Sequence, residues 1–336
     1  MLIEKEKENI KMAKVKNFKT IFPAVSVPLN DDYSINEPEF RAYLRWIKSF
    51  YGKGMDGLVC NGHTGEITGL TRAERKRVVE ICAEECGDVM TIISGVNCEN
   101  TEESIEMAKE AKEAGADGIL LMPPHMWLRF GMNPNAPFEY VKDVAEGADI
   151  DIIIHLYPAT SKAFYPVETL IKMCKEIDHV KCIKMGTRVT SIYEHDVRLL
   201  RQKCPDISLI TCHDETLCVS WFPGMDGALI GFAGCVPEII CPARDVFANP
   251  DKHTLKEAQD WSDRIYHISQ AIYGGGQPSG EAHARLKEAL KQRGIFTSAL
   301  MRKPVLPLNQ EEKDWVALGL ERSQLPEVDM TQYQDK

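Results

Sequence analysis

Short apolar runs alternate with longer amphipathic stretches over most of the chain. The apolar runs predict eight buried strands, which lie near 20–27, 57–61, 90–95, 117–122, 151–157, 180–184, 207–212 and 226–231. The stretches between them have helical periodicity, for example at 72–86 and 101–114, and Thr101 is the expected N-cap of the second. Strands that alternate with helices in this way indicate repeated βα units and a parallel sheet.

A recurring glycine motif marks the joint between helix and strand. It reads GMDGLVC at 54–60, GADGILL at 115–121 and GMDGALI at 224–230. The offsets of 61 and 109 residues correspond to about two and about four βα units. Eight such units predict an α/β fold, a closed (β/α)8 or TIM barrel. An open doubly wound sheet is the alternative, but no GxGxxG motif follows a strand, which disfavours it.

The pattern changes after residue 250, where helical periodicity continues at 254–273 and 281–293 without further strand-like runs. The segment GGGQPSG at 274–280 is interpreted as a linker, because it joins two helices and does not follow a strand. An extended segment with prolines then leads into a last helix. We therefore expect an N-terminal tail at 1–17, the barrel at 18–250 and a small helical C-terminal domain at 251–336.

Charge and cysteine usage limit the partners and the compartment. A formal net charge of −10 repels phosphate backbones and anionic membrane surfaces, which argues against nucleic-acid and membrane partners. The N-terminal segment lacks the apolar core of a secretory signal. Eleven cysteines, an odd number without a CxxC pair, argue against a disulfide framework and favour the cytoplasm.

The reactive groups of a TIM barrel stand at the C-terminal ends of its strands, so these ends hold the candidate chemistry. Lys184 lies near the end of VKCIKMG, where alternation places it on the same side as Cys182 and opposite to Lys181. A lysine at the mouth of an apolar barrel is partly desolvated, which leaves a free amine that can attack a ketone. The alternative is a lysine paired with a barrel carboxylate.

The ends of strands two and five carry further candidates. In IIIHLYPAT, His155 and Tyr157 share one side of a strand, where the hydroxyl can relay protons or both rings can pack in the core. The GHTGE turn after strand two can hold a carboxylate through backbone donors, or can be only a loop. Its candidate residues are Gly62, His63, Thr64 and Gly65.

Two more strand ends carry aromatic, histidine or acidic residues. His125 and Trp127 follow two prolines that stiffen the loop after strand four. His213, Asp214 and Glu215 follow strand seven and could suggest a divalent metal. No second carboxylate–histidine motif lies at a fitting spacing, so we expect no metal.

Taken together, these motifs resemble the dihydrodipicolinate synthase / N-acetylneuraminate lyase family of pyruvate-dependent class I aldolases. The likeness rests on GHTGE, a Tyr-Pro pair and IKMG, on PAVSVPLNDDYSIN near the start and on LMRKPVLPL near the end. It extends from about residue 18 to residue 310. The resemblance implies a homo-oligomer, a tetramer or a dimer, and a reaction that needs neither a metal nor an organic cofactor.

The resemblance also implies roles for individual residues. Lys184 matches the lysine that forms the Schiff base, and the loop with Thr64 matches the turn that binds the carboxylate of pyruvate. Tyr157 matches the tyrosine that shuttles protons to the imine. The family usually has two residues between this tyrosine and the proline, and alignment on the proline places His155 there instead. Ile230 is expected to line the pocket.

Several positions depart from the pattern of the synthases in this family. His63 replaces the first of two adjacent threonines, and His125 with Met126 replaces a tyrosine pair. The arginine expected soon after Pro158 is missing. These changes argue against true dihydrodipicolinate synthesis, although they leave imine chemistry in place.

The expected function is a lyase or aldolase that makes or breaks a C–C bond between a 2-oxo acid, such as pyruvate, and an aldehyde. The aldehyde half is expected over His63, His125 and Trp127. One alternative is dehydration of a keto-deoxy sugar acid through the same imine. Two further alternatives are a condensation like that of the synthases and a 2-oxo acid-binding protein without turnover.

Overall fold

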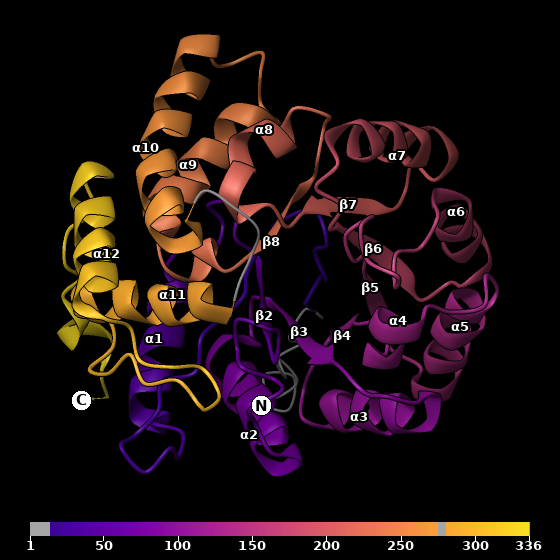
Figure 1. Cartoon of the computed structure of the whole chain (residues 1–336), viewed down its shortest axis with the longest axis horizontal. Coiled ribbons are helices and arrows are strands. Elements are labelled where there is room, and N and C mark those ends of the chain that lie inside the picture. The colour runs from indigo at the N-terminus through magenta and orange to yellow at the C-terminus, as the bar shows by residue number, and fades with distance from the viewer. Residues whose placement is uncertain (1–13, 275–279, 336) are drawn as a thin grey trace, which may run out of the picture.

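Eight parallel strands form the centre of the molecule in the computed structural model, which describes residues 14–274 and 280–335. They pair in the order β1-β8-β7-β6-β5-β4-β3-β2, and a bridge between Ala24 and Val59 joins β1 to β2. Helices surround these strands, which confirms the predicted TIM barrel (Figure 1). The strands are β1 (Ile21–Pro23), β2 (Gly57–Cys60), β3 (Thr91–Val96), β4 (Gly118–Leu121), β5 (Asp151–His155), β6 (Val180–Met185), β7 (Ser208–Thr211) and β8 (Gly227–Ile230).

Most helices of the described residues follow a strand and pack on its outer side, and the last ones lie beside the barrel. The α-helices are α1 (Glu37–Lys48), α2 (Arg72–Cys86), α3 (Thr101–Glu113), α4 (His125–Phe130), α5 (Ala136–Ala148), α6 (Val167–Glu176), α7 (Thr190–Lys203), α8 (Leu217–Trp221), α9 (Pro237–Ala248), α10 (Leu255–Tyr273), α11 (Gly280–Gln292) and α12 (Gln310–Arg322). Three short 3-10 helices are η1 (Asp214–Thr216), η2 (Phe232–Gly234) and η3 (Met330–Tyr333).

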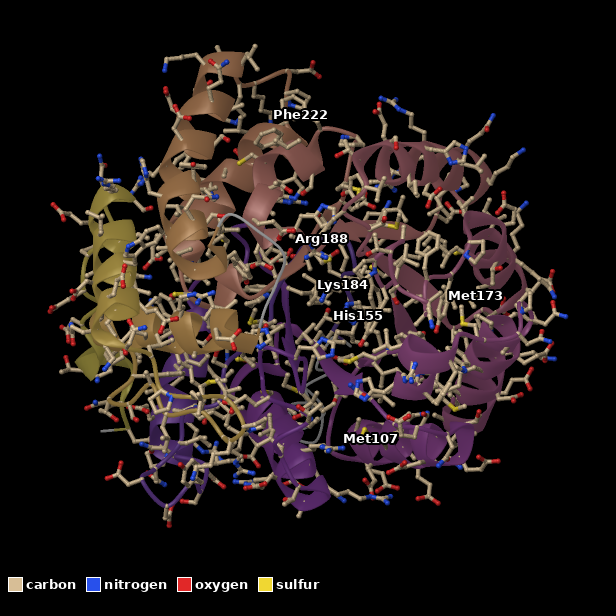
Figure 2. The ribbon with its side chains drawn as sticks, in the orientation of Figure 1. Met107, His155, Met173, Lys184, Arg188 and Phe222 are labelled. Carbon is tan, nitrogen blue, oxygen red and sulfur yellow. The ribbon has the colours of Figure 1, made fainter. Side chains whose placement is uncertain are left out.

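The interior of the barrel is filled by side chains from alternate strand positions. Phe22, Ile153 and Cys182 belong to this buried layer, whereas Lys181 is exposed. Side chains alternate along a strand, so Lys184 shares the inner side with Cys182, as predicted. In Figure 2, His155, Lys184 and Arg188 lie near the centre of the molecule, while Met107 and Met173 lie among the outer helices.

The predicted bounds of α2 are confirmed, but the predicted cap of α3 is wrong. Asn100, with an extended backbone (φ −139°), is the N-cap, and its Oδ1 accepts the N–H of Glu103 at 2.8 Å. Thr101 is therefore the first residue of the helix. Both side chains can cap a helix, and the backbone conformation decides which one does.

The helices after the barrel are those that the periodicity predicts, within one residue at each end. Gly274 ends α10 in the left-handed conformation (φ 62°), which glycine adopts without strain. The rest of the predicted linker, apart from Gly280, lies outside the described residues. Helix α10 packs against α9, α11 and α12. The division at residues 18–250 and 251–336 stays a prediction.

Near the N-terminus, the part of the predicted tail at 1–13 lies outside the described residues. Beyond it, Asn17 Nδ2 donates to Asp56 Oδ2 at 2.9 Å, and Lys16 Nζ donates to Asp151 Oδ2 at 2.8 Å. All eleven cysteines carry free thiols. Within the two described stretches of chain, no helix is both long and apolar enough to cross a membrane.

Candidate active site

A cavity of about 450 Å³ opens at the C-terminal ends of the strands and gathers most of the predicted residues. The predicted residues that line it are Gly62, His63, Thr64, His125, His155, Tyr157, Lys184 and Ile230. Gly65 is buried behind the loop, where an added Cβ would lie 3.0 Å from the carbonyl oxygen of Val25. Trp127 lies away from the cavity and packs edge-on against Tyr140 and Tyr165.

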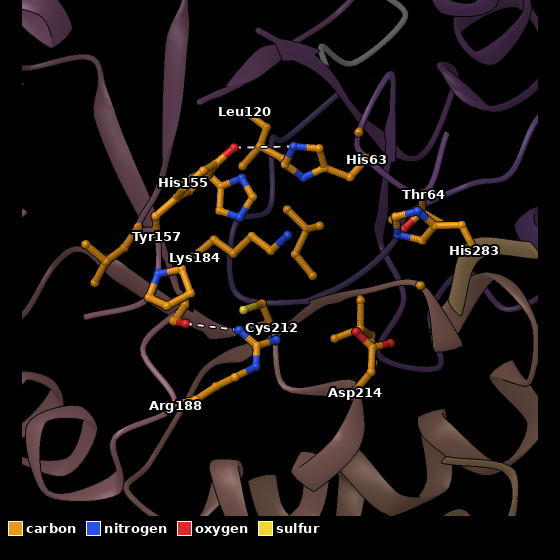
Figure 3. Close-up of a pocket in the computed structure, with 18 of the residues that line it drawn as sticks. His63, Thr64, Leu120, His155, Tyr157, Lys184, Arg188, Cys212, Asp214 and His283 are labelled. Atoms are coloured by element: carbon orange, nitrogen blue, oxygen red, sulfur yellow. Dashed lines mark hydrogen bonds between the residues drawn. The ribbon is translucent and has the colours of Figure 1, made fainter. Parts of the chain in front are cut away.

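Lys184 stands on β6 beside His155 of β5, with which it is in register. Its amine extends into the centre of the cavity (Figure 3). Burial lowers the pKa of Lys184, while Cys212 and Asp214 oppose that shift. No carboxylate of the described residues lies within 4.0 Å of its Nζ. The structure therefore contradicts the alternative that Lys184 is paired with a barrel carboxylate.

Three aromatic side chains form a cluster beside this amine. The rings of His155 and Tyr157 meet edge to face, with centroids 4.9 Å apart, and the Tyr157 hydroxyl lies 3.3 Å from His63 Nε2. Burial raises the pKa of Tyr157, so the phenol keeps its proton. Burial, aided by the charge of Lys184, lowers the pKa of His63 to about 3 and that of His155 well below 6.5. Both imidazoles are neutral at pH 7, so each has one N–H donor and one acceptor nitrogen for hydrogen bonds.

The loop after β2 owes its shape to residues with unusual backbone angles. Asn61 and Glu66 adopt positive φ angles of 52° and 55°. The side-chain amide of Asn61 donates to the carbonyl of Arg75 at 2.9 Å, which fixes the start of the turn. Thr64 faces the cavity, whereas the Glu66 carboxylate forms a buried ion pair with Lys287 of α11. Glu66, the last residue of GHTGE, thus anchors the loop to α11, and Thr64 remains exposed to the cavity.

His125 begins α4 at the rim of the cavity. Its Nδ1 lies 3.2 Å from Glu99 Oε1, and its Nε2 lies 3.3 Å from the side-chain amide of Asn97. Trp127 lies two residues further along α4, and its side chain points toward the outer helices. Of the two candidates from this strand end, only His125 therefore reaches the cavity.

Several cavity residues were not expected from the sequence. Arg188 bonds to Glu215 through Nε and to the carbonyl of Gly186 at 3.2 Å. Arg188 lies four residues after Lys184, in the loop that follows the same strand. This position could have identified it as a candidate from the sequence. The sequence suggests Asp214 only as a metal ligand, whereas in the structure it lines the cavity and burial raises its pKa to about 7. Cys212, Tyr273 and His283 also line the cavity.

Tyr273 and His283 come from α10 and α11, which lie beyond the barrel in sequence. No strand-end pattern points to them. Among the described residues, no group of three or more His, Cys, Asp or Glu side chains is placed to hold a metal ion. The cavity therefore combines one amine of lowered pKa with neutral imidazoles, phenols and one protonatable carboxyl group. Such a set can add to a carbonyl carbon and move protons.

Comparison with known proteins identifies the family to which this architecture belongs. The pattern of the Dihydrodipicolinate synthetase family matches residues 17–322. A 4-hydroxy-tetrahydrodipicolinate synthase from Bartonella bacilliformis is 26% identical over 304 residues, which cover 90% of this chain and 97% of that protein. Another, from Agrobacterium fabrum, is 31% identical over 270 residues, with coverage of 76% and 83%.

Solved structures show the same fold. A prophage protein of the dihydrodipicolinic acid synthase family from E. coli, in complex with pyruvate, superposes with a TM-score of 0.82 at 20% identity. That superposition covers 92% of this chain and 99% of the other. An N-acetylneuraminate lyase from Fusobacterium nucleatum gives 0.76 at 21% identity, with coverage of 90% and 97%. The chain belongs to the Dihydrodipicolinate synthetase family.

Proposed function

We propose that this protein is a class I lyase in which Lys184 forms a Schiff base with a 2-oxo acid such as pyruvate. One observation carries the proposal: an amine of lowered pKa, without an ion-pair partner among the described residues, lies between a possible carboxylate-binding loop and a cluster of proton-transfer groups. The family supports a lyase acting on pyruvate. The homo-oligomer implied by the resemblance and the cytoplasmic location favoured by the cysteine usage stay predictions.

The reaction begins when the lone pair of Lys184 Nζ attacks the keto carbon of the 2-oxo acid. The resulting carbinolamine loses its hydroxyl group as water, with a proton from Tyr157, and leaves a protonated imine. The Tyr157 phenolate then removes a proton from C3, and the electron pair of that C–H bond moves into the protonated imine, which gives a neutral enamine. The enamine carbon attacks an aldehyde carbonyl and forms the C–C bond, while the aldehyde oxygen takes the proton back from Tyr157; the reverse direction breaks the bond. Water then hydrolyses the imine and releases Lys184.

The surrounding residues have matching roles. The loop with Thr64 holds the carboxylate through its hydroxyl and backbone donors. His63, whose Nε2 lies 3.3 Å from the Tyr157 hydroxyl, accepts a hydrogen bond from the phenol and orients it. His155 is the second candidate for the proton transfer assigned to Tyr157, because it neighbours Lys184 in register and its Nδ1 has no partner among the described residues. The aldehyde half lies toward His125.

A second reaction of the same imine is favoured by Asp214. Its pKa of about 7 leaves a large protonated fraction at neutral pH, so it can donate a proton to a departing hydroxyl group. Dehydration of a keto-deoxy sugar acid would use that step. A panel of sugar acids distinguishes the two, because dehydration yields a 2-oxo product without release of an aldehyde.

The test of the central proposal is borohydride reduction in the presence of pyruvate, followed by peptide mass spectrometry. We expect a reduced pyruvyl adduct on Lys184 that is absent from Lys184→Ala. Tyr157→Phe should slow adduct formation by about 10²-fold or more. A comparable loss in His155→Phe alone would assign the transfer to His155. The proposal fails if neither pyruvate nor larger 2-oxo acids label Lys184. An adduct without turnover on any aldehyde or sugar acid would instead indicate a binding protein.

A further inference from the structure

One polar side chain in the cavity comes from outside the barrel and has no role in the chemistry above. His283 lies in the first turn of α11 and lines the cavity that holds Lys184. In Figure 3 it is drawn beside Thr64, on the side of the Lys184 amine away from Tyr157. Besides burial, the charge of Lys184 lowers the pKa of His283, and His283 helps to lower the pKa of His63, as expected for residues that line one cavity.

The position of His283 is fixed by contacts of the same helix with the strand-two loop. Lys287 lies four residues later, one turn along α11, and therefore on the same face. Its ammonium forms a buried ion pair with Glu66 of that loop and donates to the carbonyl of Leu300 at 2.8 Å. The helix is thus anchored to the loop one turn away from His283.

Gly231, at the end of β8, brings the same elements together. An added Cβ there would lie 2.7 Å from Leu286 Cδ1, 3.3 Å from Thr64 Oγ1 and 3.3 Å from the Tyr273 hydroxyl. Gly231 therefore lies close to α11, to the Thr64 hydroxyl and to α10 at once. This close approach holds α11 against the side of the cavity where Thr64 lies.

The electrostatic state of His283 suits an anion. Burial, followed by the charges of Lys184 and Lys287, lowers its pKa to about 4, so the ring is neutral at pH 7. A neutral imidazole carries one N–H donor. No hydrogen bond joins His283 to another of the described residues, so that donor is available to a ligand. The positive charge of the protonated imine at Lys184 would also favour an anion beside His283.

We propose that His283 is a further substrate-binding residue, which donates a hydrogen bond to the carboxylate of the 2-oxo acid held at Thr64. The inference rests on the proposed function and deepens it: the site selects 2-oxo acids over neutral ketones through a donor from the C-terminal helices. The keto carbon then lies at Lys184, with the carboxylate between Thr64 and His283.

The experiment compares borohydride trapping of the full-length protein by pyruvate and by its methyl ester, which keeps the ketone and removes the charge. His283→Leu should need about tenfold more pyruvate for half-maximal labelling of Lys184, because it loses a hydrogen bond to a charged group. Its response to the ester should equal that of the wild type. His283→Gln keeps an N–H donor and should retain most of the affinity for pyruvate. The matched control is Lys291→Leu, an exposed position on the same helix.

The possible outcomes are distinct. The inference is overturned if His283→Leu needs no more pyruvate than the wild type for half-maximal labelling of Lys184. It is also overturned if labelling by pyruvate and labelling by the ester weaken equally. In either case the adduct on Lys184 still supports the proposed function. Failure of the wild type to form an adduct overturns both. If His283→Leu does not fold, His283→Ala carries the same expectation, with melting temperature as the check on folding.

Discussion

Replacing Lys287 with methionine tests whether α11 is fastened to the strand-two loop by a buried ion pair. The side chains of Lys287 and Glu66 are 1% and 8% exposed, so removal of the ammonium leaves a carboxylate in a site with little water. Glu66 keeps one donor, the backbone N–H of Arg302 at 2.9 Å from Oε2. Breaking a buried pair from one side costs about 3–5 kcal/mol, and we expect about 3 kcal/mol because this donor remains.

Denaturant and thermal unfolding measure this loss. An unfolding entropy of about 2.1 cal/mol/K per residue over 336 residues converts about 3 kcal/mol to a fall of about 4 °C in Tm. The control is Lys291→Met, an exposed lysine on the same helix, which should change stability by less than about 0.5 kcal/mol. The double variant Glu66→Gln, Lys287→Met should recover much of the loss, since no buried charge remains. Stability of Lys287→Met equal to that of the control would refute the reasoning.

Three further substitutions follow from the cavity. Gly231→Ala should lose about 1–3 kcal/mol and weaken pyruvate trapping, because its methyl group meets Leu286 at 2.7 Å; unchanged denaturation and trapping would contradict this. Burial raises the pKa of Asp214 from 3.8 to about 7, so the stabilisation it gives is full below pH 3.8 and is lost as pH rises through about 7. Wild-type stability should therefore fall relative to Asp214→Asn over that range, and parallel pH profiles of Tm would exclude the shift. Arg188→Met should lose roughly 3 kcal/mol in thermal unfolding, because it leaves Glu215 about 10% exposed without its ion-pair partner; a Tm like that of the wild type would show that Glu215 finds another partner.

Much of the fold could be predicted from the sequence, because periodicity and burial are coupled. A strand buried on both faces must be apolar along its length, as in β4 and β8, and a helix on the outside must carry one apolar face. The N-cap of α3 could not be predicted in the same way, since Asn100 and Thr101 both have side chains that can cap. Only the backbone angles at the junction separate them.

The candidate site could be predicted where a residue belongs to a strand, and less well elsewhere. Alternation along β5 and β6 fixes the side on which His155 and Lys184 lie. Trp127 follows a strand end closely, but it belongs to α4, and the turn of that helix directs the indole toward Tyr140 and Tyr165. His283 reaches the cavity through tertiary packing of α11, for which the local sequence holds no signal.

The departures from the synthase pattern have a different meaning once the geometry is known. Loss of a threonine at position 63 suggests a broken proton relay, yet the imidazole of His63 is long enough to reach the Tyr157 hydroxyl at 3.3 Å. Burial and the charge of Lys184 keep that imidazole neutral, with a pKa of about 3, so at neutral pH it can accept a hydrogen bond from the phenol without taking its proton. We therefore propose that the imidazole of His63 orients the Tyr157 hydroxyl, at the position where the synthases have a threonine hydroxyl.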